Sequence, residues 1–200
     1  MAEHIDAVLY INLAHRTDRN EHILHEIHKI PNLYHEKIHR IDAIKMENGA
    51  LGCGLSHIKA LKYALDNNWK TVLVLEDDFT FKNDSIEKIG LLFDHPFDVG
   101  LLSYNGLQYS DTNNEFIKRV IYAQTTSSYI IKKEYIPILL DNMKKAMTDM
   151  LKNGKKHSNC LDIHWTSLQV KDNWYTLYPA IGYQYGNYSD IENGFRNYGC

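Results

Sequence analysis

Three consecutive carboxylates, Glu76, Asp77 and Asp78, directly follow the apolar run TVLVL at residues 71–75. This run predicts a buried strand, so the carboxylates come at its carboxyl end. Alternate side chains of an extended backbone point to opposite sides, which would place Glu76 and Asp78 together and Asp77 apart. Carboxylate oxygens are the ligands that Mg²⁺ and Mn²⁺ prefer, and such an ion offsets the charge of nucleotide phosphates. The alternative is a solvated turn in which an Asp caps the next segment.

The same carboxylates also fit a different enzyme class. The spacing Glu76-x-Asp78-x-Thr80 is similar to the haloacid-dehalogenase pattern, whose first residue is an Asp that accepts a phosphoryl group. Glu76 is one methylene longer than Asp, which would misplace the nucleophile. A phosphatase of this kind is therefore the remote alternative.

A second polar cluster, NLAHRTDR at residues 12–19, joins a predicted strand to a predicted helix. It contains Arg16 and Arg19, two of only five arginines in the chain. Guanidinium groups near a helix N-terminus suit a pyrophosphate or a nucleobase edge. In the alternative interpretation Thr17 or Asp18 caps the helix and both arginines are solvated. The chain has no Gly-x-Gly-x-x-Gly and no phosphate-loop Lys, so dinucleotide and ATP-loop sites lack support.

Histidines and a cysteine are the remaining candidates for site chemistry. His22, His25 and His28 fall away from the apolar stripe of their predicted helix, which places them on its solvated side. His57 falls at the boundary of the next helix's stripe, where either a crevice contact or a satisfied core histidine fits. Cys53, between two glycines, is expected to pack as a small apolar group.

The elements that must position these residues alternate between strand-like and helix-like patterns. Strands are predicted at residues 7–13, 37–43, 71–75, 99–104, 116–123 and 128–132. Helices are predicted at residues 17–30, 56–68, 84–93, 134–151 and 162–170, with a glycine-rich turn at 49–54 and an extended segment at 174–185. This alternation indicates an α/β fold around a mostly parallel central sheet. Ligands of such sheets bind at the carboxyl ends of the strands, which is where the acidic triplet falls.

The composition of the chain argues against several classes of function. A chain of 200 residues, 44% hydrophobic, predicts one folded domain over residues 1–200. The net charge of −3 leaves no basic excess for a nucleic-acid-binding face. No apolar run approaches the roughly 20 residues of a membrane span, and the N-terminal segment does not have the pattern of a signal peptide. With three scattered cysteines, these features predict a cytoplasmic protein.

Three segments in order resemble glycosyltransferase family 25, which includes bacterial lipooligosaccharide β-galactosyltransferases and relatives of the collagen galactosyltransferases. They are YINLAHRTDR at residues 10–19, GALGCGLSHIKAL at 49–61 and VLVLEDD at 72–78. Weaker echoes follow at TTSSYII (125–131), LDIHW (161–165) and YPAIGYQ (178–184), and at Ser189-Asp190-Ile191. The resemblance spans nearly the whole chain, although the chain is shorter than most family members.

The resemblance implies a GT-A-like (Rossmann-like) fold and an inverting hexose transfer from a UDP-sugar. It also implies a divalent metal, usually Mn²⁺, with Mg²⁺ as the alternative. The acceptor would be a hydroxyl group on a glycan, a lipooligosaccharide or a protein. Asp78 would ligate the metal, and Glu76 would face the metal or the donor ribose. The other residues that the resemblance places around the nucleotide sugar are Asn12, Leu13, Arg16, Asp18, Arg19, Ser56, His57 and Asp77.

Inverting transfer needs a base that takes the acceptor's hydroxyl proton. Asp162 is the candidate, since it aligns with an acidic position of the family, and Asp190 is the reserve candidate. Asp162 also fits the N-cap of the helix predicted after it. A domain that binds a sugar nucleotide or glycan without turnover is the alternative function. The sugar, the acceptor and the oligomeric state stay open.

Overall fold

The computed structural model describes residues 2–82, 85–189 and 194–196. The α-helices are α1 (Thr17–Ile27), α2 (Gly49–Asp66), α3 (Ile136–Asn153), α4 (Leu161–His164) and α5 (Thr166–Gln169). Short 3₁₀ helices are η1 (Ala2–His4), η2 (His35–Lys37), η3 (Ile86–Asp94), η4 (Lys133–Tyr135) and η5 (His157–Asn159). The strands are β1 (Ala7–Asn12), β2 (Ile38–Asp42), β3 (Thr71–Glu76), β4 (Phe79–Phe81), β5 (Val99–Leu101), β6 (Asn105–Asp111), β7 (Ile117–Gln124), β8 (Ser128–Lys132), β9 (Trp174–Leu177), β10 (Gly182–Gln184), β11 (Asn187–Ser189) and β12 (Gly194–Arg196).

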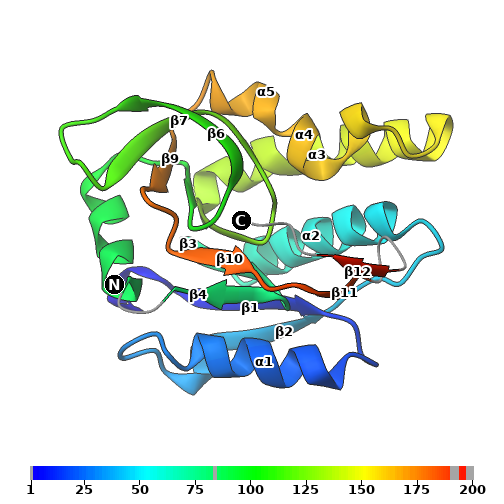
Figure 1. The fold of residues 1–200 in the computed structure, drawn as a ribbon, viewed down its shortest axis with the longest axis horizontal. Coiled ribbons are helices and arrows are strands. Elements are labelled where there is room, and N and C mark those ends of the chain that lie inside the picture. Colours follow the sequence, from blue (N-terminus) through cyan, green and yellow to red (C-terminus); the bar gives the residue numbers. More distant parts are fainter. Residues whose placement is uncertain (1, 83–84, 190–193, 197–200) are drawn as a thin grey trace.

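An eight-stranded sheet forms the centre of the fold, in the order β2-β1-β3-β8-β5-β9-β7-β6 (Figure 1). β1 pairs in parallel with β2 and β3, and β5 pairs in parallel with β9. β8 and β7 run against the other strands, so the predicted mostly parallel sheet is confirmed in strand direction, with these two exceptions. The antiparallel pairing of β3 with β8 matters for function, because it places the start of β8 beside the end of β3.

The alternating side chains of β1 divide between two apolar cores. Ala7, Leu9 and Ile11 belong to a core that includes residues of α2 and α3. Val8 and Tyr10 belong to a core on the other side, with residues of α1 and η3. Figure 1 shows α1 on one side of the sheet and α2 and α3 on the other. β1 is therefore buried on both faces, which explains its continuous apolar run.

The glycine-rich segment that the sequence predicts as a turn is instead the first part of α2, so that prediction is wrong. The helix begins at Gly49, and the side chain of Asn48 caps it by accepting from the Leu51 amide. A Cβ on Gly52 would lie 2.4 Å from the carbonyl oxygen of Ile44. The glycine therefore permits close packing of a helix against a loop, and the sequence pattern alone does not distinguish this from a turn.

Three smaller differences concern element boundaries. α1 ends at Ile27, and neither Thr17 nor Asp18 is its N-cap, because Arg16 holds that position without a side-chain cap. The predicted strand at 99–104 is shorter, since β5 ends at Leu101. β6 was not predicted because its outward side chains are mostly polar, and it pairs with β7 at the edge of the sheet.

Gly52 also supports a stability prediction. Gly52→Ala should lower the free energy of unfolding by about 1–3 kcal/mol, because the added methyl group must displace the backbone of Ile44. Gly90→Ala is the matched control, since an added Cβ there meets nothing within 4 Å, and it should change stability by less than about 0.5 kcal/mol. Urea denaturation measures both variants. Equal free energies of unfolding for the two variants would show that the loop at Ile44 shifts to accommodate the added methyl group without a loss of stability.

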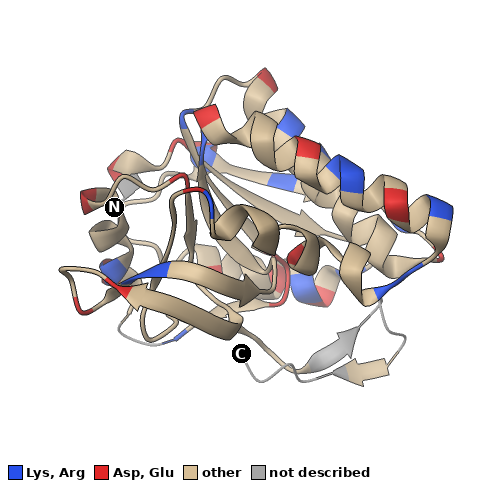
Figure 2. Ribbon diagram, turned by 90° about the horizontal axis from the view of Figure 1, so that it is seen from above, with Lys and Arg blue, Asp and Glu red and all other residues tan. Residues whose placement is uncertain are grey.

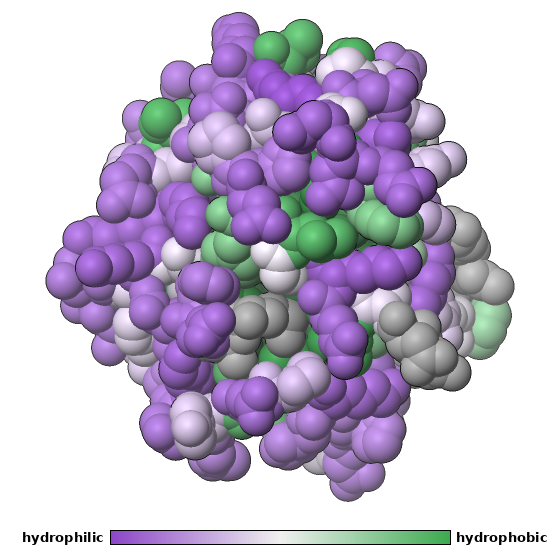
Figure 3. Space-filling view, turned by 90° about the vertical axis from the view of Figure 1, so that its left-hand side faces the viewer, coloured by the Kyte–Doolittle hydropathy of each residue, from purple (hydrophilic) through white to green (hydrophobic). Residues whose placement is uncertain are grey.

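The outer surface is largely hydrophilic. Charged residues mark α3 along its length in Figure 2, and Lys144, Lys145, Asp149 and Lys152 on this helix are exposed. Figure 3 shows a hollow with apolar side chains in the middle of another face, bordered by hydrophilic ones. Within the described ranges, none of the helices has the length and apolar character that crossing a membrane requires.

Candidate active site

A cavity with about 810 Å³ of empty space, part of it open to solvent, lies at the carboxyl ends of β1 and β3. Its lining residues come from β1, the loop after it, α1, the loop before α2, α2, the end of β3 with the turn after it, and β10: Ile11, Leu13, Arg19, Ala43, Ile44, Lys45, Met46, Gly49, Cys53, Ser56, His57, Glu76, Asp77, Asp78 and Gln184. The cavity therefore lies at the end of the sheet where the sequence predicts the ligand crevice.

All three carboxylates of the acidic triplet line this cavity. The prediction that Asp77 points away is wrong, because β3 ends at Glu76 and residues 77–78 form a turn. Glu76 accepts a hydrogen bond from the Thr126 hydroxyl at 2.6 Å and lies 3.2 Å from His57 Nε2. Asp77 and Asp78 share the Arg19 guanidinium, whose Nη1 donates to them at 2.9 and 3.1 Å.

Burial and mutual repulsion set the charge of this triplet. Burial raises the pKa of Asp77, and Arg19 only partly offsets the effect. Burial together with the neighbouring Glu76 carboxylate raises the pKa of Asp78 to about 7. For Glu76 burial acts in the same direction, but the hydrogen bond from His57 and the contact with Thr126 outweigh it, so its pKa is lowered. Burial and mutual repulsion thus disfavour the charged forms of Asp77 and Asp78 in the absence of a further cation.

This arrangement fits a hard divalent cation. The triplet offers carboxylate oxygens, the donor type of Mg²⁺ and Mn²⁺, on the wall of an accessible cavity. The raised pKa values of Asp77 and Asp78 mark carboxylates that a further cation would stabilise in their charged form. Asp78 and Glu76, the predicted metal ligands, both face the cavity in which such an ion would lie.

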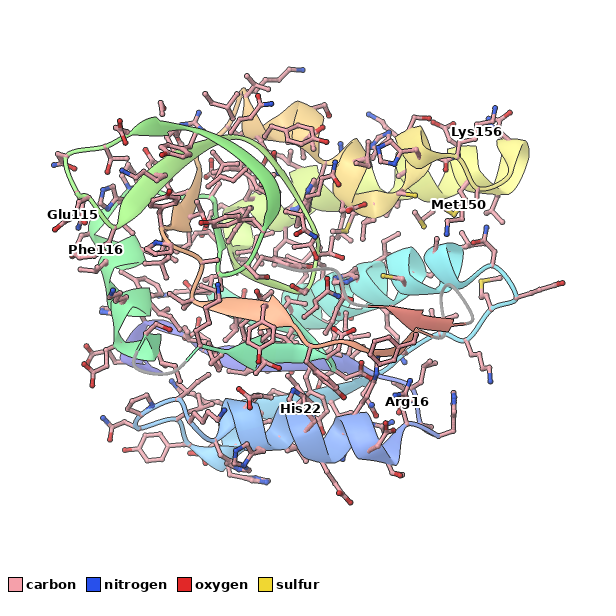
Figure 4. All side chains as sticks on the ribbon, in the orientation of Figure 1. Arg16, His22, Glu115, Phe116, Met150 and Lys156 are labelled. Atoms are coloured by element: carbon pink, nitrogen blue, oxygen red, sulfur yellow. The ribbon has the colours of Figure 1, made fainter. Side chains whose placement is uncertain are left out.

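The predicted loop segment at residues 12–19 contributes Leu13, and Arg19 from the first turn of α1, to the cavity, but not Arg16 or Asp18. Arg16 Nη2 instead lies 2.8 Å from the Asp18 carboxylate, and Figure 4 places Arg16 at the start of α1. Asn12 is buried and is not among the residues that line the cavity, but its Nδ2 donates to the Asp77 carboxylate at 2.8 Å. Of the two arginines predicted to lie around the nucleotide, Arg19 lines the cavity and Arg16 does not.

The helix α2 contributes its predicted residues Ser56 and His57. His57 is fully buried, and its Nδ1 lies 3.1 Å from the Tyr129 hydroxyl. It therefore satisfies both sequence interpretations, since it is a hydrogen-bonded core histidine that also lines the cavity. The Ser56 hydroxyl donates to Gly52 O and accepts from the Ile44 amide at 2.8 Å, which holds the loop that lines the cavity against α2.

Asp162 does not line the cavity, yet a chain of hydrogen bonds joins it to Asp78. Its carboxylate accepts from the Thr125 amide at 3.3 Å. The Thr125 hydroxyl donates to Gln184 at 2.8 Å, and the Gln184 amide donates to Asp78 at 3.2 Å. Burial raises the pKa of Asp162, which favours a proton acceptor.

The predicted capping role of Asp162 is wrong, because α4 begins at Leu161 with Cys160 at the N-cap. Asp162 lies in the first turn of the helix instead. The reserve base, Asp190, lies outside the described residues.

Three residues of the site were missed by sequence reasoning: Thr125, Thr126 and Gln184. Thr125 has a φ of 78°, a left-handed conformation that is rare for a β-branched residue and that clusters at functional sites. Its segment carries a weak family echo, which was the available signal. Gln184 also lies in a segment with a weak family echo, and it reaches the cavity through the pairing of β10 with β4.

The histidines of α1 divide differently from the prediction. His25 and His28 are exposed, as predicted, but His22 is not on a solvated side. Its Nε2 lies 3.1 Å from Phe79 O, and its ring packs against Tyr185. Figure 4 labels His22 on α1, the helix that lies beneath β4 in this view. His22 thus joins α1 to the strand that follows the acidic triplet.

Comparison with known proteins supports a glycosyltransferase. Residues 44–136 match glycosyltransferase family 25 (LPS biosynthesis protein). This range contains the motifs at residues 49–61 and 72–78, so the family resemblance is confirmed for α2 and the acidic triplet, whereas the motif at residues 10–19 lies outside the match. No curated protein matches the sequence.

Solved structures of low sequence identity share the fold. A protein from STIV aligns with a TM-score of 0.54 and 14% identity, over 96% of this chain and 93% of the other. A glycosyltransferase involved in the glycosylation of the major capsid of PBCV-1 aligns with a TM-score of 0.50 and 9% identity, over 94% and 95%. Mannose-1-phosphate geranyltransferase from Thermus thermophilus aligns with a TM-score of 0.51 and 9% identity, over 86% and 72%. These likenesses show a GT-A-like α/β fold. The family match over residues 44–136 supports a glycosyltransferase similar to family 25.

Proposed function

We propose that this glycosyltransferase moves a hexose, galactose or glucose, from a UDP-sugar to a hydroxyl group of a glycan, a lipooligosaccharide or a protein. The observation that carries the proposal is the cavity at the ends of β1 and β3, where Glu76, Asp77 and Asp78 face Arg19. A nucleoside diphosphate and a divalent cation are together complementary to such a mixture of carboxylates and a guanidinium. The family match supports this class over the haloacid-dehalogenase alternative.

Asp78 and Glu76 would hold Mn²⁺ or Mg²⁺, and that ion supplies neutralisation of the leaving diphosphate when it is bound. Arg19 would bind a phosphate oxygen while it keeps Asp77 and Asp78 in place. Leu13, Ile44 and Met46 line the cavity near these groups and would exclude water from one side of the donor. The chain's own contribution is therefore binding, orientation and charge complementarity.

Asp162 would act as the general base. In an inverting displacement, a carboxylate takes the proton of the acceptor hydroxyl as its oxygen attacks the anomeric carbon. The hydrogen bond from the Thr125 amide orients the Asp162 carboxylate, and Gln184 links Thr125 to the donor side of the site. The acceptor would then enter between Asp162 and the cavity.

A donor screen tests the proposal. The protein is incubated with several nucleotide sugars and Mn²⁺, with and without hydroxyl acceptors, and nucleotide release is measured. Release from UDP-sugars above that from GDP-sugars and ADP-sugars is expected. Tight UDP binding without release for every acceptor would favour the alternative, a sugar-nucleotide-binding domain without turnover.

The two arginines of the first loop supply a sharper prediction. Arg19→Gln should weaken UDP binding by about 10–100-fold, the worth of hydrogen bonds to a charged group. Arg16→Gln is the matched control, and we expect a change of less than about threefold because Arg16 pairs with the exposed Asp18 outside the cavity. Calorimetric titration with UDP and Mn²⁺ measures both. A larger loss in Arg16→Gln would reverse this assignment of the arginines.

A further inference from the structure

A second group of potential metal ligands lies in the same cavity, apart from the Arg19 contacts. Cys53, His57 and Glu76 each offer one ligand atom, and these atoms lie within 4.8 Å of one another. Cys53 and His57 are four residues apart on α2, a spacing that places two side chains on one face of a helix. Glu76 ends the neighbouring strand β3, and all three residues line the cavity.

The donor types distinguish this group from the oxygen donors around Asp78. A thiolate, an imidazole and a carboxylate together are the ligands of Zn²⁺, whereas Mg²⁺ and Mn²⁺ prefer oxygen alone. Bonds of about 2.0–2.3 Å at tetrahedral angles place ligand atoms roughly 3.3–3.8 Å apart. His57 Nε2 and Glu76 Oε1 are already 3.2 Å apart, so a modest side-chain adjustment would complete a three-ligand site.

The residues behind these ligands have the arrangement that metal sites require. A metal-bound histidine is usually oriented by a hydrogen bond at its other ring nitrogen, and a bound carboxylate is itself hydrogen-bonded. Here the other ring nitrogen, His57 Nδ1, lies 3.1 Å from the Tyr129 hydroxyl. The Thr126 hydroxyl donates to Glu76 at 2.6 Å. Both orienting groups come from the β7–β8 connection and β8, so the tertiary structure fixes the two ligands from behind.

We propose that Cys53, His57 and Glu76 bind a zinc-class divalent ion, with the fourth coordination position open to the cavity. Cys53 binds as the thiolate and releases its proton to solvent when the ion enters. The site does not depend on the proposed sugar transfer, because it is defined by its own donor set. Since Glu76 is also a predicted ligand of the hard metal, the two ions compete for this carboxylate.

Cobalt provides the first test, because Co²⁺ occupies zinc sites and gives a near-ultraviolet absorption when a thiolate binds it. We expect this absorption in the parent protein, its loss in Cys53→Ser, and its retention in Cys160→Ser, the matched control on the segment before α4. Cys53→Ser should also weaken Zn²⁺ binding by at least about 100-fold, the upper end of the loss from a missing orienting group. Circular dichroism establishes that both variants are folded.

A second measurement uses the unaltered chain. Stoichiometric Zn²⁺ should slow alkylation of Cys53 by iodoacetamide about tenfold or more, because a metal-bound thiolate is not free to react. The rate at Cys160, mapped by mass spectrometry in the same sample, should not change. Tyr129→Phe should weaken Zn²⁺ binding by about 10–100-fold without contacting the ion.

The outcomes separate this inference from the proposed function. Asp78→Asn should keep the thiolate–cobalt absorption, since Asp78 is outside the donor set. Absence of the absorption in the parent, or its persistence in Cys53→Ser, overturns the zinc-class site and leaves the sugar-transfer proposal intact. If the parent protein gives the absorption but releases nucleotide from no donor with any acceptor, the zinc-class site stands and the sugar-transfer proposal is overturned.

Discussion

Asp78→Asn is expected to abolish metal-dependent UDP binding and to lower turnover by about 10³-fold or more. The substitution keeps the size of the side chain but removes a charged oxygen ligand, and a bound metal supplies several kcal/mol of charge stabilisation. Calorimetric titration with UDP, with and without Mn²⁺, measures binding. Nucleotide release measures turnover.

Folding of this variant is checked by thermal unfolding in a chelator. The change costs part of the hydrogen bonding with Arg19 and Gln184, but it also removes repulsion from Glu76 and Asp77. We therefore expect a stability within about 1 kcal/mol of the parent, the worth of a single hydrogen bond. Mn²⁺ should raise the melting temperature of the parent and not that of the variant. Unchanged affinity in a folded variant would remove Asp78 from the metal site.

Asp162→Asn should lower turnover by about 10²–10⁴-fold, the usual worth of a positioned acid or base. UDP and Mn²⁺ binding should stay within about threefold of the parent, because Asp162 does not line the donor cavity. The amide oxygen of Asn can keep the hydrogen bond from the Thr125 amide, so the local structure should persist. Single-turnover and steady-state measurements with the acceptor found in the donor screen test this expectation.

Asp141→Asn is the matched control, since Asp141 is exposed on α3. It should have parental turnover. If Asp162→Asn also turns over like the parent, the base is another residue, and Asp190 is then the next candidate to replace.

Much of the architecture follows from local patterns in the sequence. The continuous apolar runs of β1 and β3 predict strands that are buried on both faces, and the alternation with helices predicts an α/β sheet. The carboxyl end of β3 then places the acidic triplet at the ligand edge of that sheet. The motif at residues 49–61 likewise indicates that Ser56 and His57 are near the site. The strands and the acidic edge depend on periodicity and on order along the chain, whereas the position of Ser56 and His57 is what the family resemblance implies.

The assignment of individual side chains depends on contacts between distant segments. The sequence made Arg16 and Arg19 equivalent, and only the packing of α1 against the end of β3 brings Arg19 to Asp77 and Asp78. The turn at residues 77–78 directs Asp77 into the cavity, against the alternation of an extended strand. A chain folds through long-range pairings that local periodicity does not encode.

Local sequence patterns were therefore enough for the family resemblance, the strands and the acidic edge of the sheet. Which groups meet at that edge depends on the folded chain. Gln184 contacts Asp78 from 106 residues away, and Thr126 contacts Glu76 from 50 residues away. Cys53, which the sequence presented as a small packing residue, becomes a neighbour of Glu76 because the packing of α2 brings Cys53 and His57 to the end of β3. The physical reason is that side-chain neighbours at a site are set by how elements pack, and packing is a property of the whole folded chain.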